Sequence, residues 1–169
     1  HVVFIVGNHD AYFKDTVNVN SLASFNNIEN VSVISEPTDI SFNDKDVLLH
    51  PWALEHNIDK NYDLIMGHFE FEGGAFNSVM TCKHGISGAE LTKKAPLVFS
   101  GHFHLRNEYN YKNGKIITVG CPLQLDWGDH GDDKGVYILD SNLKYEFIKN
   151  PVNAEHIKLK FSDIRFDIK

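Results

Sequence analysis

Short apolar runs alternate with polar segments along the whole chain, and Gly, Asn, Asp or Pro residues bound most of the runs. Runs of this length that are rich in Val, Ile, Leu and Phe are typical of β-strands rather than helices. We therefore expect strands at residues 2–6, 31–34, 38–42, 46–50, 62–66, 96–100, 106–111, 115–119, 135–139 and 145–148.

Helical patterns are scarce. Only residues 21–25 and 87–94 predict short helices. In the second segment Ser87 is followed three positions later by Glu90, which is the spacing of an N-terminal capping box.

A hairpin is predicted at residues 112–115, because Asn113-Gly114 tolerates the positive φ angles of a tight turn. Hairpins late in the chain argue against an all-parallel sheet. The predicted fold is therefore α/β, a mixed-sheet β-sandwich flanked by helices.

The 169 residues are 42% apolar and 23% charged, which fits one globular domain. We expect this domain to span residues 1–150, and residues 151–169 to begin a C-terminal extension or capping segment. Because the chain starts inside an apolar run, we expect it to be the C-terminal part of a longer protein. No apolar run approaches the ~20 residues of a membrane helix, so no membrane association is expected.

Two cysteines, Cys82 and Cys121, do not form a C-x-x-C pair and give no disulfide framework. A reducing compartment and a cytoplasmic location are therefore expected. The net charge of −7 by itself argues against nucleic-acid binding. That argument is weakened if divalent cations bind, because they invert the local field, or if a partner protein supplies basic surface.

Three short strings each follow a strand-like run: Gly7-Asn8-His9-Asp10, Gly67-His68 and Gly101-His102-Phe103-His104. Open α/β sheets carry their sites at the carboxyl ends of their strands, so these strings are expected to meet. Amide oxygens and imidazoles suit divalent Mn, Fe or Zn. Two metals about 3.5–4 Å apart can clamp a phosphoryl group and activate a water molecule. The candidate ligands are Asn8, His68, His102 and His104.

His9 and Asp10 stand directly beside a candidate ligand. A histidine held by a carboxylate is suited to protonate a leaving oxygen as a general acid. Each string also has an ordinary interpretation, since Gly-Asn-His-Asp is compatible with a plain turn and a lone Gly-His with chance. The three strings together favour a metal site.

The remaining candidates are interpreted as structural. His50, Trp52, Cys121 and Trp127 are expected to pack, and the acidic stretch 126–133 is expected to be a solvated turn. His56, His130 and His156 are expected to be exposed, and His84 has no assigned role.

These strings resemble the last three motifs of the calcineurin-like metallophosphoesterases, in the same order. Within that superfamily the chain is most similar to the SbcD-type nuclease subunit of recombination and double-strand-break repair, in its tailed-phage versions. The segments that carry this resemblance are 5–10 with 12–14, 50–52, 67–70, 100–104 and 119–122 with 128–129. Cys121 departs from it, because Ser or Thr is commoner there.

The resemblance implies a metallophosphoesterase fold and a role for each motif residue. Asn8, His68 and His102 would bind one metal, His104 would bind the other, and His9 would be the catalytic acid with Asp10 as its partner. The cofactors would be two divalent ions, Mn²⁺ by preference. The family's Asp-x-His and Gly-Asp-x-x-Asp motifs are absent, so one site is incomplete and this chain alone is expected to be inactive.

The implied activity is hydrolysis of DNA phosphodiester bonds, as exonuclease and endonuclease. The implied partners are DNA, an SMC-like ATPase subunit and a second copy of the full-length protein. Two alternatives stay open from the residues. One is a phosphoesterase acting on nucleotides or phosphoproteins, and the other is a non-catalytic binding module on the same fold.

Overall fold

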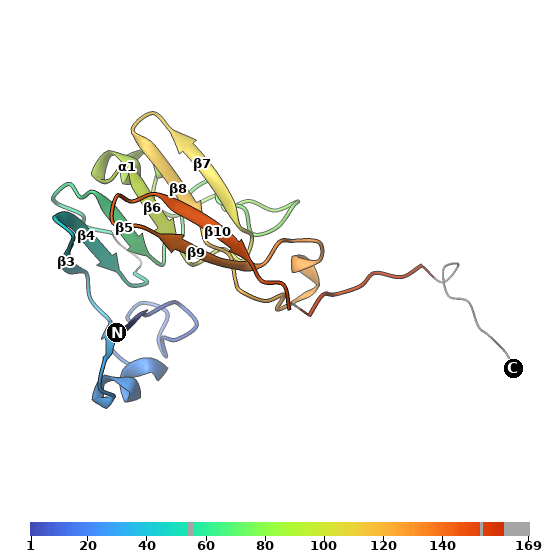
Figure 1. Cartoon of the computed structure of the whole chain (residues 1–169), viewed down its shortest axis with the longest axis horizontal. Coiled ribbons are helices and arrows are strands. Elements are labelled where there is room, and N and C mark those ends of the chain that lie inside the picture. Colours follow the sequence, from blue (N-terminus) through green and yellow to red (C-terminus); the bar gives the residue numbers. More distant parts are fainter. Residues whose placement is uncertain (54–55, 153, 161–169) are drawn as a thin grey trace, which may run out of the picture.

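The computed structural model describes residues 1–53, 56–152 and 154–160. Its centre is a six-stranded mixed sheet in the order β3-β4-β5-β6-β8-β7 (Figure 1). Strands β4, β5, β6 and β8 run parallel, and β3 and β7 close the two edges as antiparallel strands. The strands are β3 (Thr38–Phe42), β4 (Lys45–His50), β5 (Leu64–Gly67), β6 (Leu97–Ser100), β7 (Asn107–Tyr111) and β8 (Gly114–Thr118).

Two smaller pairs lie outside this sheet. Strands β1 (Val2–Ile5) and β2 (Val31–Ile34) pair in parallel, and β9 (Gly135–Leu139) and β10 (Tyr145–Lys149) pair antiparallel. Figure 1 shows the β1–β2 pair with its short helix as a lobe beside the large sheet, and β9–β10 lying across that sheet. The mixed sheet is therefore confirmed, whereas β1 pairs with β2 in a separate two-stranded sheet.

The four parallel strands are buried on both faces, which explains their nearly continuous apolar sequence. Because side chains alternate along a strand, Ile65 and Val98 face one layer while Leu64 and Phe99 face the other. The first layer contains Leu91 of helix α1 (Gly88–Lys94) and the aromatic rings of Phe69, Phe71 and Phe103. The second contains side chains of β1, β2, β9 and β10, among them Ile5, Ile34, Tyr137 and Tyr145. The central sheet is thus covered on both sides.

The predicted helices need two corrections. Residues Ser21–Asn27 form the 3₁₀ helix η1, and a second short 3₁₀ helix, η2, spans Trp127–Asp129. Helix α1 follows Ser87 as expected, but the Ser87 side chain makes no capping hydrogen bond. The backbone carbonyl of Ser87 instead accepts a hydrogen bond from Leu91 N–H at 2.9 Å, so the predicted capping box is wrong.

The predicted hairpin at residues 112–115 forms, but with a different turn. Its two-residue connection is Lys112-Asn113, because Gly114 already pairs with Tyr111. A Cβ atom on Gly114 would collide with the backbone of Pro96, so this glycine serves close packing rather than a positive φ. Two successive residues with positive φ occur instead in the hairpin between β3 and β4, at Asn43 (49°) and Asp44 (59°).

Beyond β10, the described residues 151–152 and 154–160 include no strand or helix. The final residues, 161–169, lie outside the described part of the chain. No helix among the described residues is long and apolar enough to span a membrane.

Candidate metal centre

Strands β1, β5 and β6 each end just before a candidate ligand. Backbone hydrogen bonds fix the turns that follow: His68 N–H donates to His50 O at 3.0 Å, and Gly101 N–H donates to Gly67 O at 3.0 Å. The β1 segment is tied to the large sheet through Trp52 N–H, which donates to Val6 O at 2.8 Å. The carboxyl ends of three strands from two sheets are thereby brought together.

Three of the predicted ligand side chains meet at one point. The Asn8 Oδ1 atom lies 2.8 Å from His68 Nε2, and His102 Nδ1 lies 3.3 Å from the same nitrogen. Two donors that each lie ~2.0–2.2 Å from one ion are about 3 Å apart when their bonds are near right angles. Asn8, His68 and His102 therefore have the spacing of ligands that share one divalent ion.

The two histidines are held in the form that binds metal. Burial, followed by the neighbouring imidazoles of His102, His9 and His104, lowers the pKa of His68 to about 4. Burial also lowers the pKa of His102, although the Glu70 carboxylate opposes this shift. Both rings are consequently neutral near pH 7, and neutral imidazole is the ligand form.

Close packing surrounds these rings. A Cβ atom on Gly7 would lie 2.8 Å from His68 Cε1, so the ring needs glycine at this position. Trp52 stacks on His102 and meets His68 edge-on, and Phe76 meets His102 edge-on. Trp52 packs as the sequence predicted, but its contact with a candidate ligand was not foreseen, nor was that of Phe76. Nothing in the spacing of either residue marks it, because both arrive from loops.

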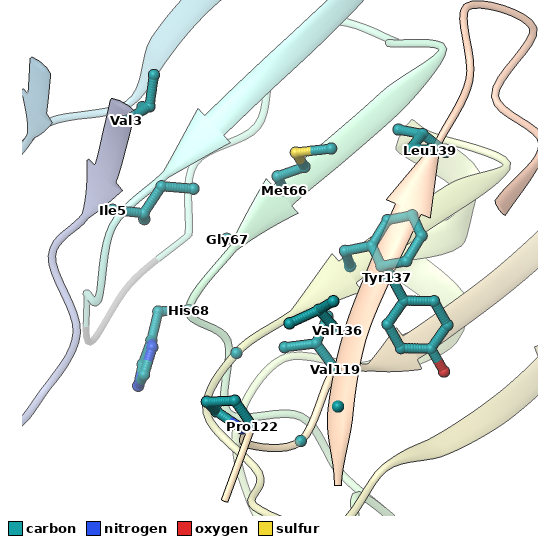
Figure 2. A pocket seen from close by; sticks show the side chains of 14 residues that line it. Val3, Ile5, Met66, Gly67, His68, Val119, Pro122, Val136, Tyr137 and Leu139 are labelled. Atoms are coloured by element: carbon teal, nitrogen blue, oxygen red, sulfur yellow. The ribbon is translucent and has the colours of Figure 1, made fainter. Parts of the chain in front are cut away.

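An apolar cavity of about 450 Å³ lies next to His68, between β1, the ends of β5 and β6, and β9. Figure 2 shows His68 at one end of it, with Val3, Ile5, Met66 and Tyr137 among the side chains along it. Among the described residues, none that lines this cavity has a charged side chain. The polar candidate residues His9 and His104 line a different cavity.

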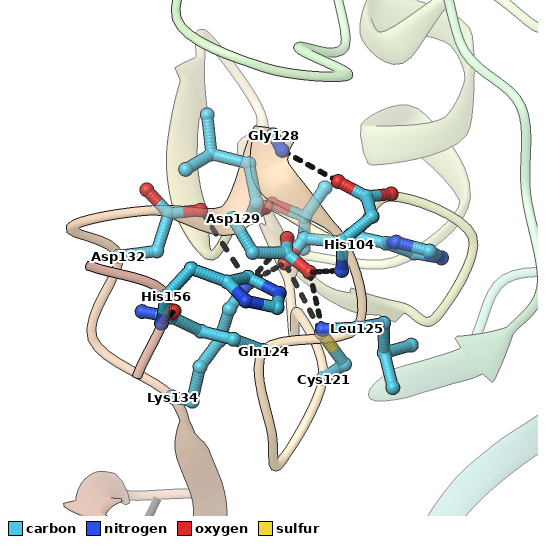
Figure 3. A network of polar contacts seen from close by, with 12 residues as sticks. His104, Cys121, Gln124, Leu125, Gly128, Asp129, Asp132, Lys134 and His156 are labelled. Carbon is cyan, nitrogen blue, oxygen red and sulfur yellow. Dashed lines mark hydrogen bonds and ion pairs between the residues drawn. The ribbon is translucent and has the colours of Figure 1, made fainter. Parts of the chain in front are cut away.

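His104 does not line the apolar cavity. Together with His9 and His102 it lines a cavity of about 300 Å³. Its backbone carbonyl accepts a hydrogen bond from Lys134 Nζ at 3.0 Å, and Lys134 also pairs with Asp129 at 2.7 Å (Figure 3). A buried ion pair thus supports the turn that carries His104.

The interpretation of residues 126–133 as a solvated turn is wrong at Asp129. This residue is only 3% exposed, and Lys134 is 1% exposed. Burial would raise the pKa of Asp129, but Lys134 and the N–H groups of Leu125 and Asp126 hold that pKa below its ordinary value. A charge-rich stretch predicts surface, whereas the Asp129 carboxylate in this stretch pairs with the buried Lys134 ammonium.

His9 is exposed and borders two cavities. The second has a volume of about 540 Å³ and is also lined by Tyr12, Lys14 and Trp52. The Asp10 carboxylate accepts from Gly7 N–H at 2.8 Å and closes the turn. Within the described residues no hydrogen bond joins Asp10 to the His9 ring.

Of the other histidines discussed from the sequence, two lie where they were predicted to lie and two do not. His50 is buried and its ring bonds Pro51 O at 2.7 Å, as a structural residue should, and His130 is exposed. His56 and His156 were expected to be exposed but are half-buried. His56 packs on His50 and Phe69, and His156 stacks on Trp127. Both corrections come from contacts with other aromatic rings.

The fold and the converging side chains define a mixed α/β protein with a candidate metal site at strand ends. No protein-family model matches the chain. Over 159 residues the chain is 31% identical to a protein of Enterobacteria phage T4 named "Exonuclease subunit 1". The aligned region covers 86% of this chain and 44% of the T4 protein. The chain thus spans less than half the length of this relative. The similarity supports a nuclease family.

Proposed function

We propose that this chain is the C-terminal part of the catalytic domain of a metal-dependent DNA nuclease subunit of the metallophosphoesterase class. The observation that carries the proposal is the meeting of Asn8, His68 and His102, with donor atoms 2.8 and 3.3 Å apart. The similarity to a phage exonuclease subunit supports the same proposal. The domain would end near residue 150, and residues 151–169 would begin an extension.

In this proposal Asn8, His68 and His102 hold one divalent ion and His104 contributes to a second, with Mn²⁺ as the preferred metal. The ions would supply an activated water and neutralise the phosphate charge. His9 would protonate the leaving oxygen, which fits its exposure beside both cavities. Asp10 would act as its partner through the turn that its bond to Gly7 closes.

DNA as substrate is supported by the surroundings of His9. Tyr12 is 78% exposed, and Tyr12, Lys14 and Trp52 line the cavity beside His9. Aromatic rings beside a basic side chain suit stacking on bases and pairing with phosphates. The complete subunit would act in recombination or repair in the cytoplasm, with an SMC-like ATPase partner and as a homodimer.

The test uses a polypeptide in which Asp-x-His and Gly-Asp-x-x-Asp motifs precede this chain, together with the 169-residue chain alone. The longer polypeptide should digest end-labelled linear DNA in Mn²⁺, and the chain alone should not. His9→Ala should lower turnover by about 10²–10⁴-fold and keep Mn²⁺ binding, because general acids contribute on that scale. His102→Ala should lose Mn²⁺.

His1→Ala removes an exposed histidine and is the matched control. Equal loss of Mn²⁺ in the His9 and His102 variants would contradict the division of roles. Hydrolysis of nucleotides or phosphopeptides but not of DNA would favour the phosphoesterase alternative. Robust Mn²⁺-dependent cleavage by the chain alone, abolished by His9→Ala, would show that the second set of ligands is not required.

A further inference from the structure

A second cluster of ligand-type side chains lies outside the candidate metal centre. Glu70 follows β5, and Cys82 and His84 lie on the returning arm of a loop that leaves the sheet after Glu72. Glu70 Oε1 is 3.4 Å from His84 Nδ1 and 3.5 Å from Cys82 Sγ, and Cys82 Sγ is 3.8 Å from His84 Nδ1. The sequence left His84 without a role.

The backbone holds this triangle together from both sides. Cys82 N–H donates to Gly74 O at 2.7 Å, and Gly73 N–H donates to Cys82 O at 2.9 Å. One step further along, Ile86 N–H donates to Glu70 O at 2.9 Å. Gly85 has a φ of +95°, in the left-handed region that favours glycine, and a Cβ atom there would collide with Glu70 O. The arms carrying the three side chains are therefore fixed before any ligand binds.

The triangle has the size of one face of a zinc tetrahedron. Zinc lies about 2.3 Å from thiolate sulfur and about 2.0–2.2 Å from imidazole nitrogen or carboxylate oxygen. At tetrahedral angles these bonds put the donor atoms about 3.3–3.6 Å from one another. The distances of 3.4, 3.5 and 3.8 Å match that spacing with shifts of a few tenths of an ångström.

The donor set selects the metal. Thiolate with imidazole favours zinc over manganese, and zinc also stands above manganese in the general order of affinity. The Cys82 thiol now donates to His84 O at 3.1 Å, and metal binding would release that proton to solvent. The His84 side chain is 74% exposed, so an ion has an open path and water can take the fourth position.

We propose that Glu70, Cys82 and His84 bind a zinc ion that fastens the base of the loop over residues 73–82. The loop folds back on itself through an isolated bridge between Ala75 and Thr81. Phe76, Asn77 and Met80 from the loop line the cavity that also holds His9, His102 and His104. The zinc ion is structural, and it sets the position of one wall of the candidate metal centre.

The test is titration of the metal-free 169-residue chain with Co²⁺ and with Zn²⁺. Co²⁺ should give a thiolate charge-transfer absorption and the intense visible bands of four-coordinate geometry, and Zn²⁺ should abolish both signals. Cys82→Ser should lose the charge-transfer band, whereas Cys121→Ser, the matched control for the other buried cysteine, should keep it. His102→Ala should also keep it, which separates this site from the candidate metal centre.

His84→Asn guards against a folding defect, because this side chain is mostly exposed and its loss should weaken binding without unfolding the chain. In the His102→Ala background, which removes a ligand of the candidate metal centre, Zn²⁺ should also raise the melting temperature, and it should not do so once Cys82→Ser is added. Absence of a charge-transfer band would overturn the proposal. So would a band that Cys121→Ser removes and Cys82→Ser retains, because it would place the ion beside His104 and Asp129.

Discussion

Trp52 and His102 are stacked, with ring centroids 5.3 Å apart and planes inclined by 26°. The tryptophan follows β4 and the histidine follows β6, so the contact joins two strand ends that the chain reaches separately. The indole covers one face of the imidazole and restricts its rotation. Trp52 is thus a positioning residue for a candidate metal ligand.

Trp52→Leu should weaken binding of Mn²⁺ at Asn8, His68 and His102 by about tenfold, because supporting contacts around ligands contribute on that scale. Isothermal titration of the chain with Mn²⁺ measures the effect. Trp52→Phe should recover part of the loss by keeping an aromatic face. Trp127→Leu, at a tryptophan that is 61% exposed, is the control and should bind as the parent does.

Gly7→Ala should displace the His68 ring, since the added Cβ would lie 2.8–3.2 Å from three of its atoms. Overpacking of this kind costs about 1–3 kcal/mol, and the ligand geometry would be lost with it. Mn²⁺ affinity and the melting temperature should therefore both fall. At Gly101 an added Cβ meets His68 Nδ1 at an ordinary 3.5 Å, so Gly101→Ala should change both much less. Equal effects would refute the steric explanation.

Lys134→Met should lower the free energy of unfolding by about 3 kcal/mol or more, because it leaves the buried Asp129 carboxylate without its cation. Chemical denaturation followed by circular dichroism measures this change. Lys149→Met breaks an exposed pair with Asp133 and should have little measurable effect. If both variants lowered the free energy of unfolding equally, burial would not make the Lys134–Asp129 pair more important for stability than the exposed pair.

Stability should fall as the pH drops from about 6.5 toward 4. Burial, and next the neighbouring His50, lowers the pKa of His56 to about 4, so in this range the unfolded chain binds a proton that the native chain does not. His56→Phe should flatten the dependence by on the order of 1–2 kcal/mol. Denaturation at several pH values with a metal chelator present tests this, and H130Q, at an exposed histidine, is the control. An unchanged slope in His56→Phe would assign the dependence to other groups.

The parts of the site that follow strands were predictable from sequence. Asn8, His68 and His102 stand just after apolar runs, and in the structure Asn8 and His102 both lie within hydrogen-bonding distance of His68 Nε2. The bounds of the strands also agree closely, as at 97–100 against the expected 96–100. Periodicity and turn residues carry this information because strand ends are local features.

The supporting residues were not predictable in the same way. Trp52, Phe76 and Lys134 reach the site from loops, and their contacts depend on tertiary packing rather than on neighbours in sequence. Asp129 lies in an acidic stretch, and composition alone predicts that such a stretch is exposed to solvent. Its carboxylate is buried because it pairs with Lys134, five residues further along the chain. The separation of β1 from the large sheet likewise depends on which strands pair, and apolar runs do not encode pairing.

The three meeting side chains come from two different sheets, since Asn8 follows β1 and both histidines follow strands of the large sheet. An ion shared by them would be a cross-link between the β1–β2 lobe and the main body. Affinity for the ion and docking of the lobe would then be one linked equilibrium, in which each strengthens the other by the same factor. A ligand that pulls on the lobe would loosen the ion, and chelation of the ion would free the lobe to move.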